Sequence, residues 1–454
     1  MIEKLKNNFL SGKIGLKNSS KLNILTQLLV FGFQFVCSVI LARKLLPAGR
    51  GQYAILVLIP STIYTLGNLG LTVSISYLSA KNPGKATVVN ANNLFCAFIL
   101  SVIYSTAISV AYLCNGLGVL SDFLSWKHIV LINISLFFLF FVNYSQAFLL
   151  GQNYIPARNF IRFFEALFFF AFLFFMAIIG RLGLWDAFLG WFITRGLSCL
   201  FSIFLLLKLR CLSFKPDFRL LLNSLKIGGK AFFATVAGFI ILRSDIYLLE
   251  YFKGDAATGI YSIAASLSFL LLSVPESISS ALFPHIMKLE HVEKKDGTAK
   301  TLLIFRLTYI VTGAIAFIGI VGAPFLIKLI YGPQFGDSVY PFMILAFAVT
   351  IGGCSFVLDA QLYARSLFWI KTILSFIAAI MNIVLNILLI PKYSIVGAAL
   401  SSLVSYGFFG ITLNYLYCRS VQCRLSELVP GFKDFSAIAD LFKEQISFIK
   451  RSRQ

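Results

Sequence analysis

Two apolar runs near the carboxyl end decide the fold: ILSFIAAIMNIVLNILLI (373–390) and VGAALSSLVSYGFFGITLNYLYC (396–418), separated by PKYSI (391–395). A bilayer core about 30 Å thick takes roughly 20 apolar residues of helix, so each run is long enough for one crossing. Neither run shows the strict alternation of apolar and polar residues that a membrane β-barrel needs. The stretch therefore predicts a hairpin of two transmembrane helices.

The rest of the chain has the same character. Of its 454 residues, 59% are hydrophobic and 13% are charged, whereas soluble domains carry about 25% charged residues. The predicted fold class is an all-α integral membrane protein with about 12 transmembrane helices. Apolar windows bounded by turns and charges place these spans near 22–42, 52–78, 91–113, 128–150, 159–179, 184–207, 230–250, 257–283, 302–327, 340–362, 369–390 and 396–418.

The amino-terminal segment is a lysine-rich head (1–21) followed by the first apolar run. Because no small-residue cleavage site follows a short apolar segment, the run is expected to be a retained span and not a cleaved signal peptide. The eight cysteines are scattered, mostly inside apolar runs, and the chain has three histidines and no CxxC motif. Such cysteines are typical of helix packing, so neither a metal site nor a cofactor is expected.

The distribution of basic residues predicts the orientation in the membrane. With the amino terminus in the cytoplasm, the inner segments carry 29 of the 39 basic residues and the outer loops carry 8. This bias places both termini in the cytoplasm. The net charge of +21 then faces the inner leaflet and its acidic lipids, and because no soluble basic domain is present, nucleic acid is not an expected partner.

The two halves of the chain repeat. GQYA (51–54) and GIYS (259–262) each precede a long apolar run, and they are 208 positions apart; the short link 179–187 resembles 390–398 at an offset of 211. Because six spans separate the copies, the repeat is parallel, which predicts two six-helix bundles around a central cavity. The predicted domains are the head 1–21, the bundles 22–207 and 230–418, the cytoplasmic linker 208–229, and the tail 419–454 with an amphipathic surface helix over 435–449.

Three ionisable residues lie well inside predicted spans. Arg195 is near the middle of the sixth span, and Arg243 and Asp245 lie toward the outer half of the seventh. A charge at the bilayer centre costs about 2.5 to 3.5 kcal/mol, so each must face a wet cavity or a partner. Two positions on a helix differ by about 200°, so Arg243 and Asp245 face opposite sides. A hydrated cavity is favoured for both arginines, and helix-locking pairs with carboxylates are the alternative.

Other polar residues within spans have both a structural and a functional interpretation. Glu165 can form an ion pair with Arg162 three positions earlier, and Glu276 follows Pro275, which would kink its helix at a possible gate. Polar side chains also share helix faces, where they either line a cavity or hold helices together. These faces consist of Gln27, Gln34 and Ser38; of Ser262, Ser266, Ser273 and Ser277; and of Ser375, Asn382 and Asn386.

An enzyme is disfavoured by the loops. The outer loops are short, and the chain carries no P-loop, no Asp-x-Asp metal site in an inner loop and no paired His and Cys constellation. The sequence therefore favours a transporter that does not use ATP through this chain alone.

Several short motifs, in order along nearly the whole chain, resemble the polysaccharide transporter family. This family contains the oligosaccharide flippases of bacterial O-antigen and capsule synthesis, within the superfamily that also holds multidrug and toxin extrusion proteins. The matching stretches are LARKLLP (41–47) before GQYA (51–54), LGL (69–71), RSD (243–245), GIYSIA (259–264), FP (283–284), YG (331–332), 382–391 and GAA (397–399).

The resemblance implies two bundles around a cationic cavity that moves undecaprenyl-diphosphate-linked oligosaccharide to the outer leaflet by alternating access. It also implies a multi-pass protein of the bacterial inner membrane, serving lipopolysaccharide or capsule synthesis beside a polysaccharide polymerase and a chain-length regulator. Arg43 and Arg243 lie in matching motifs, so the resemblance gives them the role of holding the pyrophosphate. Arg195 is added here because guanidinium groups stay charged and offer bidentate donors.

Two other functions stay open. A drug or toxin antiporter of the same superfamily would be expected to use acidic cavity residues to bind cations, whereas the deepest charge here is Arg195. A membrane-embedded sugar polymerase or ligase would need a larger outer loop.

Overall fold

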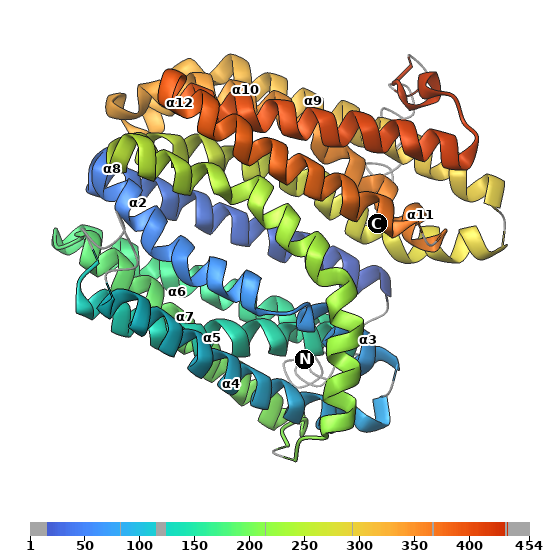
Figure 1. The fold of residues 1–454 in the computed structure, drawn as a ribbon, viewed down its shortest axis with the longest axis horizontal. Coiled ribbons are helices and arrows are strands. Elements are labelled where there is room, and N and C mark those ends of the chain that lie inside the picture. Colours follow the sequence, from blue (N-terminus) through green and yellow to red (C-terminus); the bar gives the residue numbers. More distant parts are fainter. Residues whose placement is uncertain are drawn as a thin grey trace, which may run out of the picture. The chain divides into compact units, whose positions relative to one another are not determined.

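The computed structural model describes residues 16–81, 83–114, 124–213, 215–292, 294–365, 367–431 and 434. Within these residues the secondary structure is helical, joined by short turns (Figure 1). The α-helices are α2 (Leu16–Gly67), α3 (Leu71–Lys81), α4 (Ala86–Leu113), α5 (Trp126–Gly151), α6 (Ile155–Ile179), α7 (Leu184–Lys208), α8 (Phe218–Val292), α9 (Lys294–Tyr331), α10 (Val339–Gly353), α11 (Asp359–Ala364) and α12 (Phe368–Val421). The short 3-10 helices are η1 (Pro83–Lys85), η3 (Pro333–Ser338), η4 (Cys354–Leu358) and η5 (Leu425–Leu428).

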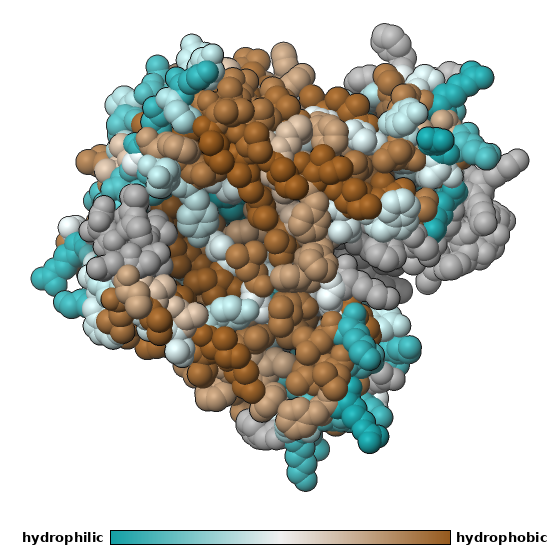
Figure 2. Space-filling view, in the orientation of Figure 1, coloured by the Kyte–Doolittle hydropathy of each residue, from teal (hydrophilic) through white to brown (hydrophobic). Residues whose placement is uncertain are grey.

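The long helices carry their apolar side chains outward. Within the described residues, nine helical segments are long and apolar enough to cross a membrane. Large hydrophobic side chains such as Phe98, Phe317 and Ile380 are more than 60% exposed, and Figure 2 shows brown apolar side chains over the helix flanks, with teal hydrophilic ones toward the helix ends. Surfaces of this kind need hydrocarbon as their solvent. The chain is a multi-pass integral membrane protein.

Three helices are interrupted in the middle. At 1.5 Å per residue, roughly 20 residues cross a bilayer, whereas α2, α8 and α12 contain 52, 75 and 54 residues. Each consists of two helices joined at a residue with positive φ: Leu46 (60°), Gly254 (76°) and Ser394 (51°). In α2 the next residue is Pro47, which has no amide hydrogen to continue the ladder.

The predicted span 52–78 is wrong as a continuous helix. α2 ends at Gly67 and α3 begins at Leu71, with Leu69 and Gly70 both at positive φ. A Cβ atom on Gly70 would lie 2.0 Å from the carbonyl oxygen of Gly228, so the interruption lies where two backbones meet. The predicted span 340–362 is likewise divided into α10, η4 and α11.

Backbone features recur at nearly constant spacing. The interruptions at Leu46 and Gly254 are 208 positions apart. α7 and α12 end in the same type of cap. Arg210 and Gln422, which are 212 positions apart, follow these helices with φ of 54° and 60°. In each cap the following amide, of Cys211 or Cys423, donates to the carbonyl five residues earlier at 3.0 Å, which is the hydrogen bond of a Schellman motif.

The chain divides into two compact units. The first takes in the residues up to Ser262 together with Ile330–Gln334, and the second takes in Ile263–Leu329 and the residues from Phe335 onward. The second half of the predicted linker 208–229, from Phe218, is the start of α8. The division into bundles at this linker stays a prediction.

The described part of the tail folds onto α9 in the second unit. Arg306 donates to the carbonyl oxygen of Glu427 at 2.8 Å, and its Nε lies 3.0 Å from the Asp434 carboxylate. The amphipathic helix predicted over 435–449 lies outside the described residues.

In the first unit, α2 and α8 cross through glycines. A Cβ atom on Gly51 would lie 2.0 Å from the carbonyl oxygen of Asp255, and one on Gly259 would lie 1.8 Å from that of Pro47. Beside this crossing, the Gln52 amide donates to the Asp255 carboxylate at 2.6 Å. The GQYA and GIYS motifs of the sequence therefore meet because only glycine lets the two backbones approach this closely.

Candidate functional site

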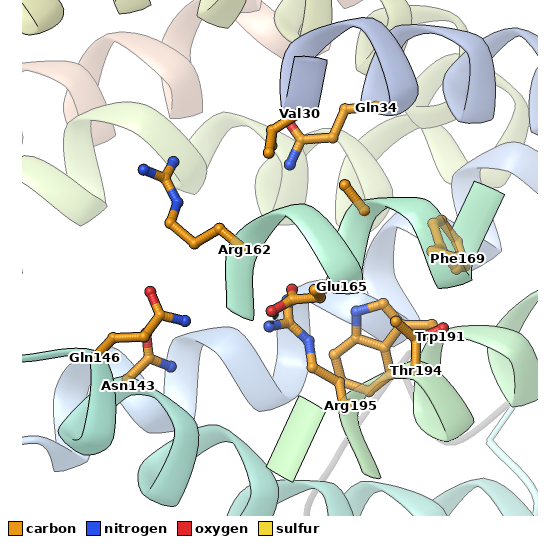
Figure 3. A pocket seen from close by; sticks show the side chains of 11 residues that line it. Val30, Gln34, Asn143, Gln146, Arg162, Glu165, Phe169, Trp191, Thr194 and Arg195 are labelled. Atoms are coloured by element: carbon orange, nitrogen blue, oxygen red, sulfur yellow. Dashed lines mark ion pairs between the residues drawn. The ribbon is translucent and has the colours of Figure 1, made fainter. Parts of the chain in front are cut away.

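A cavity of about 330 Å³ lies among four helices of the first unit (Figure 3). The side chains that line it are Val30 and Gln34 of α2, Asn143 and Gln146 of α5, Arg162, Glu165, Ala166 and Phe169 of α6, and Trp191, Thr194 and Arg195 of α7. On α6 and α7 these residues follow the helical pattern i, i+3, i+4, with Phe169 at i+7 on α6, so each helix turns one face to the cavity.

Arg195 forms the ionic contact of this cavity. Its guanidinium lies 2.6 Å from the Glu165 carboxylate on α6, and the two side chains are 24% and 21% exposed. The same guanidinium lies 5.6 Å from the ring centre of Trp191, one turn earlier on α7, a distance typical of a cation–π contact. The salt bridge therefore joins α6 to α7 at a position that is partly open to the cavity.

The predicted partner of Glu165 is corrected by this geometry. Arg162 also lines the cavity, but its side chain extends away from Glu165, whereas that of Arg195 ends against it (Figure 3). Spacing along one helix suggested Arg162, and the neighbouring helix supplied a cation at hydrogen-bonding distance instead.

The cavity also contains polar residues that sequence reasoning missed. Asn143 and Gln146 are three positions apart on α5, and Thr194 precedes Arg195 on α7. The Asn143 amide donates to the carbonyl oxygen of Leu139 at 2.8 Å, which leaves its own carbonyl oxygen as an acceptor. Two amide side chains on one face of a very apolar run were a usable signal, since polar residues inside spans are costly.

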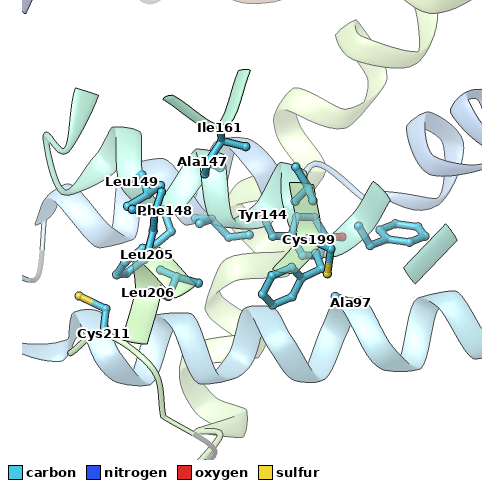
Figure 4. Packing of buried hydrophobic residues seen from close by; sticks show 14 of the residues in the cluster. Ala97, Tyr144, Ala147, Phe148, Leu149, Ile161, Cys199, Leu205, Leu206 and Cys211 are labelled. Carbon is cyan, nitrogen blue, oxygen red and sulfur yellow. The ribbon is translucent and has the colours of Figure 1, made fainter. Parts of the chain in front are cut away.

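Close packing of α5, α6 and α7 holds the cavity walls in place (Figure 4). Tyr144 and Phe148 of α5, Ile161 of α6, and Cys199 and Leu206 of α7 belong to one cluster and are at most 3% exposed. Because lipid is as apolar as these side chains, association of the helices depends on such close contacts and not on exclusion of water.

Arg43 and Arg50 lie at the interruption of α2 and differ in environment. Arg43, a predicted substrate contact, is exposed and donates from Nε to the carbonyl oxygen of Ile330 at 2.7 Å. Arg50, predicted to be in an outer loop, is 7% exposed, lies 3.4 Å from the Ser38 hydroxyl and 5.6 Å from the ring centre of Tyr53. This burial could not be predicted from the sequence, since an arginine between two apolar runs is typical of a loop.

Arg243 and Asp245 lie in the first helix of α8 and do not line this cavity. Asp245 is buried, at 3% exposure, and its carboxylate accepts hydrogen bonds from the Tyr261 hydroxyl and from the amide of Ile246. Arg243 is half-buried. A substrate path between the bundles that uses Arg243 stays a prediction.

The remaining predicted residues lie in the second unit. Asn382 and Asn386 of α12 are fully buried, and the Asn386 amide donates to the Asn382 carbonyl oxygen at 2.9 Å. In α8, Pro275 is buried and Glu276 is exposed; the described residue with non-helical angles inside this helix is Gly254. The gating kink at Pro275 stays a prediction.

The cavity is suited to an anion attached to polar, ring-shaped groups. Two guanidiniums and one carboxylate give it a net positive charge. Guanidinium groups can donate two parallel hydrogen bonds to the oxygens of one phosphate. The amide side chains of asparagine and glutamine both donate and accept hydrogen bonds. Trp191 and Phe169 supply flat apolar surfaces.

The arrangement of helices is that of known membrane transporters. A structure of the lipid II flippase MurJ in an inward closed conformation matches with a TM-score of 0.69 and 14% identity, over 94% of this chain and 92% of that chain. An inward-facing multidrug resistance MATE family transporter of the MOP superfamily matches with a TM-score of 0.68 and 12% identity. This match covers 89% of this chain and 98% of that chain. At such identities the likeness defines the fold and not the cargo.

The particular family follows from the sequence. Residues 16–290 match the family described as polysaccharide biosynthesis protein, and the chain belongs to this family. The family predicted from the motifs is thereby confirmed.

Two relatives come from Haloferax volcanii. "Probable low-salt glycan biosynthesis flippase Agl15" is 20% identical over 50% of this chain and 52% of that protein. "Probable flippase AglR" is 31% identical over 36% of this chain and 34% of that protein. The chain thus spans about a third to a half of the length of these relatives.

Proposed function

We propose that this protein is a flippase that moves undecaprenyl-diphosphate-linked oligosaccharide from the inner to the outer leaflet of a bacterial cytoplasmic membrane by alternating access. It then serves lipopolysaccharide O-antigen or capsule synthesis and passes its cargo to a polysaccharide polymerase and a chain-length regulator. The family and the relatives named as flippases support transport of a lipid-linked glycan.

The cationic cavity carries this proposal. A diphosphate that joins a lipid to a sugar has two negative charges and cannot cross hydrocarbon unaided. Arg162 and Arg195 offer two fixed positive charges against the single negative charge of Glu165, and Trp191 and Gln146 lie in the same cavity. A cation antiporter would instead need an excess of acidic groups there.

The interruptions of α2, α8 and α12 support twelve crossings. If each of these three helices crosses the membrane twice, the nine long apolar segments give twelve spans, and both chain ends lie on one side. The features that recur 208 and 212 positions apart support two parallel six-helix halves. In this topology Gly254 lies at the outer surface and the linker 208–229 at the inner surface.

Transport can be measured directly in vesicles. The purified protein in proteoliposomes should make a fluorescent diphosphate-linked oligosaccharide accessible to an external glycosidase much faster than protein-free vesicles do. Absence of such transport would contradict the proposal. Efflux of organic cations without glycan transport would establish the antiporter instead, and lengthening of the glycan would establish a polymerase.

The orientation predicts the outcome of reporter fusions. Because the basic residues are concentrated on the predicted inner segments, a phosphatase reporter fused to a chain truncated after residue 255 should be active, and one fused after residue 454 should be inactive. A fluorescent reporter that folds only in the cytoplasm should show the opposite pattern. Phosphatase activity at residue 454 would overturn the topology.

A further inference from the structure

We propose that the segment joining α7 to α8, residues 208–213 and 215–226, is a docking surface for acidic phospholipids of the adjoining leaflet. The α7–α8 segment connects two membrane spans, α7 and the span of α8 that begins at Phe232, so it lies at one face of the bilayer. Its position there depends only on these two crossings and not on which face is cytoplasmic.

Hydrogen bonds from α4 hold the α7–α8 segment in place. The Asn92 side chain contacts the backbone of Asp217 twice: its amide donates to the Asp217 carbonyl oxygen at 3.0 Å, and its carbonyl oxygen accepts from the Asp217 amide at 2.8 Å. The Asn90 amide donates to the carbonyl oxygen of Cys211 at 2.9 Å. The segment is therefore fixed to a spanning helix at two points.

The first turns of α8 present an exposed face that is partly apolar and partly basic. Phe218 and Leu222, four positions apart, are 60% and 61% exposed, although the Phe218 ring also touches the edge of Phe95 on α4, with ring centres 5.5 Å apart. Arg219 and Lys226 are exposed as well. At roughly 100° per residue they lie beside the apolar pair on the same side of the helix.

The charge of the α7–α8 segment is strongly positive. Its basic residues are Lys208, Arg210, Lys215, Arg219 and Lys226, all of them exposed, and its acidic residue is Asp217. The Asp217 carboxylate caps α8, because it accepts hydrogen bonds from the amides of Arg219 and Leu220 at 2.9 and 3.2 Å. None of the five basic side chains forms a salt bridge with another described residue.

An acidic glycerophospholipid matches both parts of this surface. Its headgroup supplies the negative charge, and the boundary between headgroups and acyl chains accepts exposed apolar side chains such as Phe218 and Leu222. Each lysine or arginine near an anionic membrane surface strengthens binding by about fivefold. A zwitterionic lipid offers the same apolar contact without a net charge, so it should bind this surface more weakly.

Photo-crosslinking measures this preference at the α7–α8 segment itself. The full chain is placed in phosphatidylcholine vesicles with a trace of phosphatidylglycerol or phosphatidylcholine that carries a diazirine near the head end of one acyl chain. After digestion with an enzyme that does not cut at basic residues, crosslinks within 215–226 are quantified by mass spectrometry. The phosphatidylglycerol probe should give at least about tenfold more crosslinking there than the phosphatidylcholine probe.

Substitutions separate the charged contact from the apolar one. Arg219→Gln/Lys226→Gln should lower crosslinking by the phosphatidylglycerol probe about tenfold or more and leave that by the phosphatidylcholine probe unchanged. Leu222→Ser should lower both by the same factor, because both lipids lose the same apolar contact. The matched control is Lys127→Gln/Arg181→Gln, which removes two exposed basic side chains, at the start of α5 and in the turn before α7. This control should keep the original preference.

Salt provides a test that needs no substitution. Because about 1 M sodium chloride screens exposed charges beyond roughly 3 Å, the preference of the unsubstituted protein for the phosphatidylglycerol probe should shrink strongly at that concentration. Equal crosslinking of the segment by the two probes at low salt would overturn the proposal. An undiminished phosphatidylglycerol yield in Arg219→Gln/Lys226→Gln would also overturn it.

Discussion

Replacing Arg195 with alanine is expected to abolish export of the polysaccharide while the protein stays folded in the membrane. The change removes one of two cavity guanidiniums and leaves Glu165 without its partner. Removing the arginine from a charged contact with the bound diphosphate costs roughly 2 to 5 kcal/mol of binding free energy. This cost corresponds to a loss of transport of about thirtyfold or more. Lipid-linked oligosaccharide should accumulate inside the cell, and lysine should restore transport in part, because it keeps the charge but not the paired donors.

Arg181→Ala is the control for this variant, since Arg181 is exposed in the turn between α6 and α7. It should transport normally. Surface polysaccharide and membrane abundance are measured together for both variants. Normal export by Arg195→Ala would exclude the guanidinium from the substrate path. If the Arg195 variant disappeared from the membrane and a second change, Glu165→Gln, restored its abundance, the pair would be a structural link between α6 and α7.

Alanine at Gly51 or Gly259 is expected to prevent folding of the first unit. The new methyl carbon would lie within about 2 Å of a backbone carbonyl oxygen at either position. Backbone atoms of a packed helix cannot turn aside as a flexible side chain can, so the two helices must separate. We expect each variant to lose more than about 4 kcal/mol, seen as loss of the monodisperse peak in fluorescence-detected size-exclusion chromatography.

Gly32 and Gly238 are matched controls in the same two helices, because a Cβ atom at either meets nothing within 4 Å. Alanine there should leave the peak intact or increase its thermal stability, since glycine in a helix interior costs roughly 0.5 to 1 kcal/mol relative to alanine. Normal folding of Gly51→Ala or Gly259→Ala would show that the crossing is looser than the distances indicate.

The sequence predicted helices from local properties. Long apolar runs identify spans because every backbone group in lipid must be bonded within the segment, and the helical, membrane-embedded class and the family followed. The interruption at Leu69 and Gly70 was missed because long apolar runs flank it on both sides, although Gly67, Asn68 and Gly70 are residues typical of turns. Its cause is the backbone approach to Gly228, about 160 positions away.

The candidate site illustrates the same limit. Arg195 was identified because a charge inside an apolar run is conspicuous, but its partner depends on how α6 and α7 pack. Arg162 is three positions from Glu165 and Arg195 is thirty positions from it, so only the tertiary structure could decide between them. Spacing along one helix predicts which residues of that helix are neighbours, but it does not predict contacts with a second helix.

The crossing of Gly51 and Gly259 has a consequence for the origin of the chain. Gly51 meets the carbonyl of residue 255 and Gly259 meets that of residue 47, so each side of the contact mirrors the other at an offset of 208. A contact of this kind is what two identical subunits make across a twofold axis. Duplication and fusion of a shorter ancestor that formed a homodimer through this one glycine would produce such a contact. The hydrogen bond from Gln52 to Asp255 breaks the symmetry, because the mirrored pair is Ile260 and Pro47, whose side chains cannot form it.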